Sequence, residues 1–301
     1  MLSEVLDVDK LKAAGRIAVA SREYAVGLVK PGALVLDVCE SIERFIVESG
    51  GLPAFPCNLS INEVAAHYTP GLGDSSVIPE GAVVKVDIGV HVDGFIVDTA
   101  ATVDLSGEYG KLLETTVRAL EEAVSVVKPY VSLYDIGRVI ERAVRDGGFK
   151  PIRNLSGHNI GRYIVHAGLS IPNVADRSLY RLRIQPGTLI ALEPFATNGK
   201  GLVVDGPTIN IYSYTGRGPK MGLTSLEAEL LDYVSREYRT LPFAARWLRN
   251  WKGGDVEGLL KLLHSKGVLH GYPVLIEAGR GVVAQFEHTV LVTESDVIVL
   301  A

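Results

Sequence analysis

The amino-acid sequence predicts an α/β (α+β) protein made of two related halves, each with helices that cover an antiparallel sheet. The first observation is an internal repeat, because residues 29–60 and 127–156 share Val-Lys-Pro, Ile-Glu-Arg, Gly-Gly and Asn-Leu-Ser in the same order. The second is that the segments leading to Asp87 and to Glu193 also match. The third is an Asp-Gly pair between two Val-rich segments, which is typical of a β-hairpin.

Length, composition and charge describe an ordinary globular protein. The chain has 301 residues, of which 47% are hydrophobic and 22% charged, and its net charge is -5. This charge gives no long-range attraction to nucleic acid or to an anionic membrane. The chain contains no run of about 18 apolar residues, no basic start of a secretory signal, and only Cys39 and Cys57 as cysteines. We therefore expect a cytoplasmic protein that binds neither nucleic acid nor membranes.

Helices are expected early in each half. In the second half, Ser132-x-x-Asp135 resembles a capping box and Gly147 supplies a stop. The apolar positions between them recur at helical spacing, namely Ile136, Val139, Ile140, Ala143 and Val144. The matching helix of the first half has an apolar face formed by Val38, Ile42, Phe45 and Ile46. Both helices need a sheet to cover.

The hairpin of the first half is predicted from residues 83–90 and 95–103. If its loop is Asp93-Gly94, Asp98 faces Gly89 and lies diagonal to Asp87. If the loop is instead Val92-Asp93, the two acids lie directly opposite each other. Both registers place the two carboxylates on one side of the sheet, and the other side of the first strand (Val84, Val86, Ile88 and Val90) faces the helices.

A matching hairpin is expected in the second half, with Glu193 in its first strand and Glu287 in the strand at 282–292. The long separation of these strands predicts a helical insert at residues 212–273. In it, Thr224-x-x-Glu227 forms a capping box before an apolar face (Leu226, Leu230, Leu231, Val234 and Tyr238), and Leu259, Leu260, Leu262 and Leu263 suggest a second helix. The predicted core domain comprises residues 1–211 and 274–301, with half-repeats at about 9–110 and at 111–211 plus 274–301.

The acids of the two halves predict a metal site, to which His158 adds an imidazole. An acid in a strand is usually solvated, as Asp93 is expected to be beside its turn glycine. Matched pairs from two copies converge, however, and close carboxylates repel unless a cation lies between them. Four carboxylates and one imidazole suit two divalent cations, Co, Mn, Fe(II) or Zn, and hydrolysis is the natural reaction class. The proposed ligands are Asp87, Asp98, His158, Glu193 and Glu287.

His67 and His166 are the candidate histidines for contact with substrate. Taken singly, each is more readily a hydrogen-bonded packing residue than a catalytic one. Their comparable places in the two halves, both near the predicted site, favour a catalytic role. His288 follows Glu287 directly, so strand alternation turns it to the opposite face, and we interpret it as structural.

In these residues the chain resembles type II methionine aminopeptidases along nearly its whole length. The matching pieces are Pro-Ala-Phe-Pro at 53–56, residues 62–70, Lys-Val-Asp-Ile-Gly-Val at 85–90, Asp-Gly-Phe at 93–95, Asp98-Thr99, Asn-Leu-Ser-Gly-His at 154–158, His-Ala-Gly at 166–168, Glu-Pro-Phe-Ala-Thr at 193–197, Leu-Pro-Phe at 241–243 and Ala-Gln-Phe-Glu-His-Thr at 284–289. The resemblance implies the pita-bread fold, with pseudo-two-fold halves and a curved antiparallel sheet. The insert resembles the one that separates type II from type I members, and the start of the chain resembles archaeal members.

The resemblance also implies a role for each site residue. Asp87 binds one metal, Asp98 and Glu287 bind both, and His158 and Glu193 bind the second. Glu193 is in addition the implied proton shuttle. His67 and His166 are implied to contact the peptide and to steady the tetrahedral intermediate. Phe55, Val165 and Tyr272 resemble parts of the pocket for the methionine side chain.

The implied function is removal of the initiator methionine from nascent polypeptides when the next residue is small. A monomer, with a transient ribosome contact, is expected. One alternative is another pita-bread peptidase, such as one that cleaves before proline and shares the ligands. A second is a non-catalytic pita-bread protein that binds other molecules, although such a protein would be expected to have lost ligands.

Overall fold

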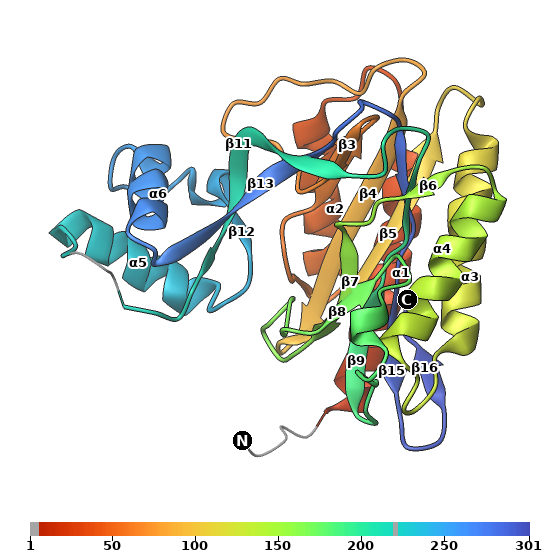
Figure 1. The fold of residues 1–301 in the computed structure, drawn as a ribbon. Coiled ribbons are helices and arrows are strands. Elements are labelled where there is room, and N and C mark those ends of the chain that lie inside the picture. The colour runs from red at the N-terminus through yellow and green to blue at the C-terminus, as the bar shows by residue number, and fades with distance from the viewer. Residues whose placement is uncertain (1–5, 219–221) are drawn as a thin grey trace.

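The computed structural model describes residues 6–218 and 222–301 and contains two similar halves (Figure 1). The first half has α1 (Val8–Leu28), α2 (Val35–Glu48), β1 (Leu52–Pro53), β2 (Asn58–Ile61), β3 (Val64–Ala66), β4 (Val83–Val92) and β5 (Phe95–Asp104). The second has α3 (Gly110–Val126), α4 (Leu133–Asp146), β6 (Lys150–Pro151), β7 (Ser156–Ile160), β8 (Ser170–Pro172), η1 (Arg177–Leu179), β9 (Thr188–Leu192), β10 (Phe195–Thr197), β14 (Val283–Gln285), β15 (His288–Val292) and β16 (Val297–Val299). Helices precede strands in both, which confirms the predicted class.

The helices of each half cover one face of its strands. α1 packs on β4 and β5, and α3 packs on α4, β10 and β14. The apolar face of β4 is buried in the same core as α1 and α2, as predicted. A separate core fills the second half. Because side chains alternate along a strand, Asp87 and Asp98 lie on the face that is turned away from α1.

The β4–β5 hairpin follows the first of the two predicted registers. Its loop is Asp93-Gly94, and Gly89 pairs with Asp98 while Asp87 pairs with Ala100. Asp93 and Gly94 have φ angles of 53° and 82°, the left-handed pair that a type I′ hairpin turn requires. Asp87 and Asp98 are therefore diagonal neighbours on one face.

The matching hairpin of the second half is interrupted where its acids lie. β9 pairs with β15 and β10 pairs with β14, but Glu193 falls between β9 and β10 and Glu287 between β14 and β15. The prediction that both acids lie within strands was therefore wrong. Pro194 has no N–H and breaks the ladder at this point. Glu287 instead joins the other half, since its N–H donates to the carbonyl of Ala100 at 3.1 Å.

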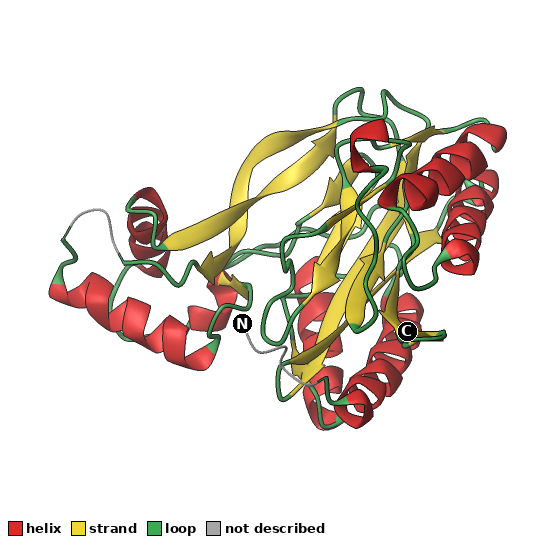
Figure 2. Ribbon diagram, turned by 60° about the horizontal axis from the view of Figure 1, so that its bottom comes forward, coloured by secondary structure: helices red, strands yellow, loops and turns green. Residues whose placement is uncertain are grey.

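A helical lobe lies beside the two halves and is connected to them by a long two-stranded ribbon (Figure 2). The ribbon is β11 (Val203–Tyr214) paired with β13 (Leu269–Glu277), and β13 also pairs with β3. The lobe contains α5 (Ser225–Glu237), β12 (Phe243–Ala244), η2 (Ala245–Leu248) and α6 (Val256–Ser265) around its own hydrophobic cluster. The boundaries 212–273, and the half-repeats given for the core, remain a prediction.

The two helices predicted in the lobe form, but particular side chains differ from the prediction. The capping box of α5 forms, but Leu226 is exposed because Glu227 faces inward and binds Lys266 at 2.6 Å. Leu262 of α6 is also exposed, whereas its three predicted partners are buried.

The second predicted capping box, at the start of α4, does not form. Ser132 makes no capping bond and instead donates to the carbonyl of Tyr180 at 2.9 Å. Gly147 does follow the last residue of α4. In α2, Phe45 is half-buried and stacks on Tyr24. Among the described residues, no helix combines the length and apolar character that crossing a bilayer requires.

We predict that Gly94→Ala destabilises the protein by roughly 2–3 kcal/mol, since it adds both left-handed strain and a steric clash. A Cβ at Gly94 would lie 2.3 Å from ring atoms of Tyr163. Gly107 has a similar φ of 74° with open space around it, so Gly107→Ala should cost only about 1 kcal/mol. Urea unfolding of both variants checks this, and equal losses would contradict the steric part.

Candidate functional site

One cavity of about 310 Å³ brings together every residue predicted for the site. Its lining comes from both halves and from the β11–β13 ribbon. The predicted residues among the lining are Phe55, His67, Asp87, Asp98, His158, Val165, His166, Glu193, Tyr272 and Glu287. His288 does not line this cavity. Segments that are far apart in the sequence therefore meet at one place.

Threonine hydroxyls join the two halves next to the acids of the cavity. The Thr289 hydroxyl accepts from the N–H of Asp98 at 2.8 Å and donates to its carbonyl at 2.7 Å. Thr99 donates to the carbonyl of Glu287 at 3.1 Å, and Thr102 donates to that of Gln285 at 2.6 Å. Because these bonds flank Asp98 and Glu287, they set the two carboxylates side by side.

The acids and His158 form a tight, buried cluster. Ligand atoms of Asp98, His158 and Glu287 all lie within 4.8 Å of one another. The His158 Nε2 atom is 3.6 Å from Asp98 Oδ2 and 3.5 Å from Glu193 Oε1. Asp98 and Glu287 are only 3% and 1% exposed, so water screens their charges poorly.

The electrostatics of this cluster fit a bound cation. Burial raises the pKa of Asp87 to about 7. Burial and then neighbouring carboxylates raise the pKa values of Asp98, Glu193 and Glu287 well above the usual range. One oxygen of each of Asp87, Asp98 and Glu287 is buried without a hydrogen-bond donor from the described residues. An oxygen-rich set with one imidazole is the donor chemistry that divalent first-row metals accept.

Gln285 is a site residue that the sequence reasoning missed. Its side chain is 1% exposed, and Nε2 lies 3.4 Å from both Glu193 Oε2 and Glu287 Oε2. A neutral amide donor at this place orients two carboxylates without adding charge. The spacing of Gln285 and Glu287, two residues apart in an extended segment, was the available signal.

The Asn-Leu-Ser repeat also contributes more than was predicted. Asn58 and Asn154, the first residues of the two copies, both line the cavity. Asn58 pairs across the sheet with Asp87, whereas Asn154 exchanges hydrogen bonds with the backbone of Val203. The repeat therefore marks the same cavity from both halves.

His67 and His166 both lie near the ring of Tyr272 in the cavity. The ring of Tyr272 is 5.6 Å from that of His67 and 6.3 Å from that of His166, and His166 lies 4.3 Å from His158. Burial lowers the pKa of His67 and lowers that of His166 to about 4, so both rings are neutral at pH 7. The Nδ1 atom of His67 is 3.2 Å from the carbonyl oxygen of Pro273. In the neutral ring this bond places the proton on Nδ1 and leaves Nε2 as an acceptor.

Comparisons with known proteins show the family of the chain. The sequence model of metallopeptidase family M24 matches residues 9–294. A methionine aminopeptidase of Saccharolobus solfataricus is 48% identical over 97% of each chain, and one of Pyrococcus horikoshii is 50% identical over 98% of this chain and 99% of its own.

Solved structures show the same fold at lower identity. A thermophilic Arx1 superposes with a TM-score of 0.82 at 16% identity, covering 99% of this chain and 91% of its own. A methionine aminopeptidase of Thermotoga maritima superposes with a TM-score of 0.70 at 22% identity, covering 100% and 98%.

We predict that cation binding releases more protons at pH 6 than at pH 8. Asp87, with a pKa raised to about 7, is mostly protonated at pH 6 and must lose that proton to bind a cation, whereas His158, with a pKa lowered to about 3, has no proton to lose. Affinity should therefore fall as the pH drops through this range. Calorimetry in buffers of different ionisation enthalpy measures the release, and equal release at both pH values would contradict the assignment.

We also predict that Asp98→Asn stabilises the metal-free protein at pH 8 by on the order of 1–2 kcal/mol, because it removes one of several crowded charges. The same variant should lose most of the stabilisation that added Mn²⁺ or Co²⁺ gives the parent protein. Thermal unfolding with and without metal measures both effects. Asp146→Asn, on the exposed face of α4, is the control and should change neither quantity.

Proposed function

The chain belongs to metallopeptidase family M24, and we propose how the residues around its cavity carry out the reaction of a methionine aminopeptidase. It is a metal-dependent hydrolase with the pita-bread fold. Relatives that share about half of its residues over nearly the full length are methionine aminopeptidases, and the chain has this activity. The observation that supports the proposed mechanism is the convergence on one cavity of the five proposed ligands and two histidines, which come from distant segments.

We assign two divalent cations per chain, Co, Mn, Fe(II) or Zn, to the carboxylate cluster. Asp87 would hold one cation, His158 and Glu193 would hold the other, and Asp98 and Glu287 would contribute oxygen ligands to both. When bound, such cations polarise the peptide carbonyl and lower the pKa of the attacking water. Gln285 keeps the Glu193 and Glu287 carboxylates in place by donating to one oxygen of each.

Glu193 is the proposed proton carrier. Its side chain is 12% exposed at the cavity wall. Gln285 lies next to its Oε2 atom, and His158 lies next to its Oε1 atom. Burial raises the pKa of this carboxyl group, so its ionised form is a stronger base than a solvated glutamate. The group therefore accepts a proton from the attacking water and passes it to the amine that leaves.

The two neutral histidines take different parts. His67 has an acceptor at Nε2, which suits an N–H of the substrate. The oxyanion needs a donor, so His166, the counterpart of His67 in the other half, is assigned to the carbonyl oxygen. The ring of Tyr272 lies near both imidazoles.

The apolar part of the cavity is the proposed pocket for the methionine side chain. Phe55, Val165 and Tyr272 line it together with Phe195, Ile211 and Pro242. The proposed substrate is the N-terminal methionine of a nascent polypeptide with a small second residue. A monomer in the cytoplasm, in transient contact with the ribosome and without affinity for nucleic acid or membranes, completes the proposal.

Peptide assays after metal removal test this function. Stripped protein should be inactive, and single additions of Co²⁺, Mn²⁺, Fe²⁺ or Zn²⁺ should restore cleavage of Met-Ala-Ser but not of Ala-Pro-Ser. Cleavage of the proline peptide alone would favour the rival peptidase, and no cleavage of either by any metal would favour a binding protein.

Glu193→Gln should lower kcat by at least about 100-fold, because the amide carries no proton between water and amine. Steady-state kinetics with Met-Ala-Ser, at saturating metal and with the metal content measured, checks this. A loss explained wholly by missing metal would assign Glu193 a ligand role only.

A further inference from the structure

The loop that carries His67 is held in an unusual conformation. His67 has a φ of 65°, which is uncommon for a residue other than glycine and persists only where the surroundings impose it. Its ring forms a hydrogen bond with the carbonyl of Pro273 in β13. Two residues further on, Thr69 is fully buried and makes the contacts that fix the loop.

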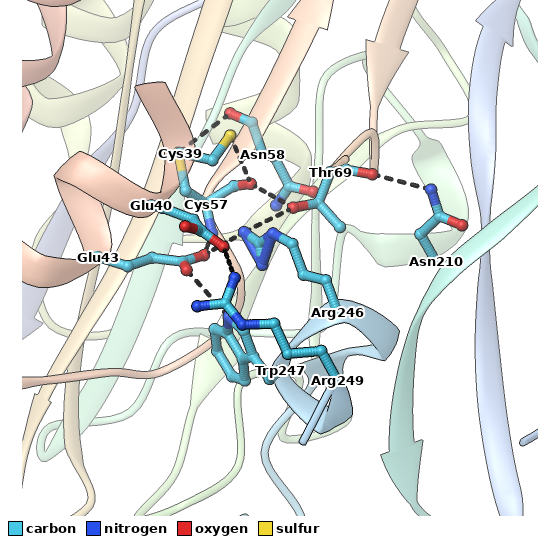
Figure 3. A network of polar contacts seen from close by, with 10 residues as sticks. All are labelled: Cys39, Glu40, Glu43, Cys57, Asn58, Thr69, Asn210, Arg246, Trp247 and Arg249. Carbon is cyan, nitrogen blue, oxygen red and sulfur yellow. Dashed lines mark hydrogen bonds and ion pairs between the residues drawn. The ribbon is translucent and has the colours of Figure 1, made fainter. Parts of the chain in front are cut away.

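Thr69 joins the core to the ribbon and the lobe (Figure 3). Its hydroxyl donates to the carbonyl of Cys57 at 2.8 Å and accepts from Nη2 of Arg246 at 3.2 Å. Its carbonyl accepts from Nδ2 of Asn210 at 2.9 Å. Asn210 lies in β11 and Arg246 in η2, so both partners outside the core come from the ribbon and the lobe.

Arg246 is itself bound by a carboxylate of the core. Glu43 of α2 accepts from Nη2 of Arg246 and, at 2.9 Å, from the indole N–H of Trp247. The same carboxylate accepts from the backbone N–H of Cys57 at 3.0 Å, one residue before Asn58 in the cavity wall. Arg246 is 2% exposed, and its Nε and Nη1 atoms have no acceptor among the described residues. Burying a guanidinium with two unpaired nitrogens costs desolvation free energy. An apolar contact could attach the lobe without this cost.

A second contact ties the lobe to the loop before His166. Thr240 donates to the carbonyl of Tyr163 at 2.6 Å, and the guanidinium of Arg239 lies 4.1 Å over the ring of Tyr163. Tyr163 lies three residues before His166, and Thr69 lies two residues after His67, so each contact of the lobe is close in sequence to a site histidine. The lobe therefore contacts both loops that present the histidines.

We infer that Arg246 is a positioning residue for the reaction, which acts through Thr69 on His67 and makes docking of the lobe a condition for an aligned site. The inference rests on the proposed role of His67. Arg246 touches neither the cavity nor the proposed ligands, so its loss should misplace an imidazole while the cations stay bound. A displacement of about 1 Å in a catalytic group lowers turnover by up to 100-fold.

The test compares Arg246→Met and Thr69→Val, singly and together, in the cobalt-loaded full chain with Met-Ala-Ser as substrate. Each single variant should lower kcat roughly 10- to 100-fold with unchanged metal content, and the double variant should be no worse than either. Thr69→Ser keeps the hydroxyl and should restore kcat to near the parent value. Arg249→Met is the matched control, because Arg249 joins the same two elements through Glu40 on the surface and does not contact Thr69.

Several results would overturn the inference. They are unchanged kcat in Thr69→Val, multiplied losses in the double variant, or an equal loss in Arg249→Met. If Arg246→Met does not fold, the comparison of kcat between Thr69→Val and Thr69→Ser tests the inference by itself. The imidazole proton resonances of His67, assigned with His67→Asn, should shift in Arg246→Met and stay in place in Arg249→Met. Failure of the parent protein to cleave Met-Ala-Ser would count against the proposed function instead.

Discussion

Repulsion among four buried carboxylates is the constraint on which the rest of this structure depends. One oxygen of each of Asp87, Asp98 and Glu287 has no hydrogen-bond donor among the described residues, and the imidazole of His158 beside them is held neutral by burial. The fold carries this strain because each pair of acids is attached to a different, separately packed core. The repulsion lowers the folding stability of the metal-free protein, and a bound cation restores it. Such a loss of stability is typical of functional sites.

Turn chemistry and duplication explain why much of the fold and site could be predicted. Asp93-Gly94 determines the β4–β5 register, because a two-residue loop with both residues in the left-handed region matches the strand twist. Repetition of the same sequence pieces then located Glu193 and His158 without any further signal. The break at Glu193 escaped prediction because it depends on Pro194 within an otherwise regular strand pattern.

Contacts between residues that are far apart in the sequence could not be predicted. Gln285 carries no charge, so it did not stand out among the acids it orients. The bond between Thr69 and Arg246 joins residues 177 positions apart, and no periodicity or motif relates them. The exposure of Leu226 also depended on a tertiary contact, because Glu227 faces the lobe interior, where it forms an ion pair with Lys266. Sequence patterns describe the local conformation that a segment prefers. These side-chain contacts depend instead on the residues that the fold brings next to the segment.

The threonine hydroxyls between the halves have an evolutionary consequence. Thr99, Thr102 and Thr289 join β5 to the C-terminal strands through backbone atoms of the very residues that bear the acids and their amide partner. Either half produced alone would leave these hydroxyls and half of the acids without counterparts. Once the ancestral gene had doubled and this seam had formed, a return to a free-standing single unit would have cost both the fold and the chemistry.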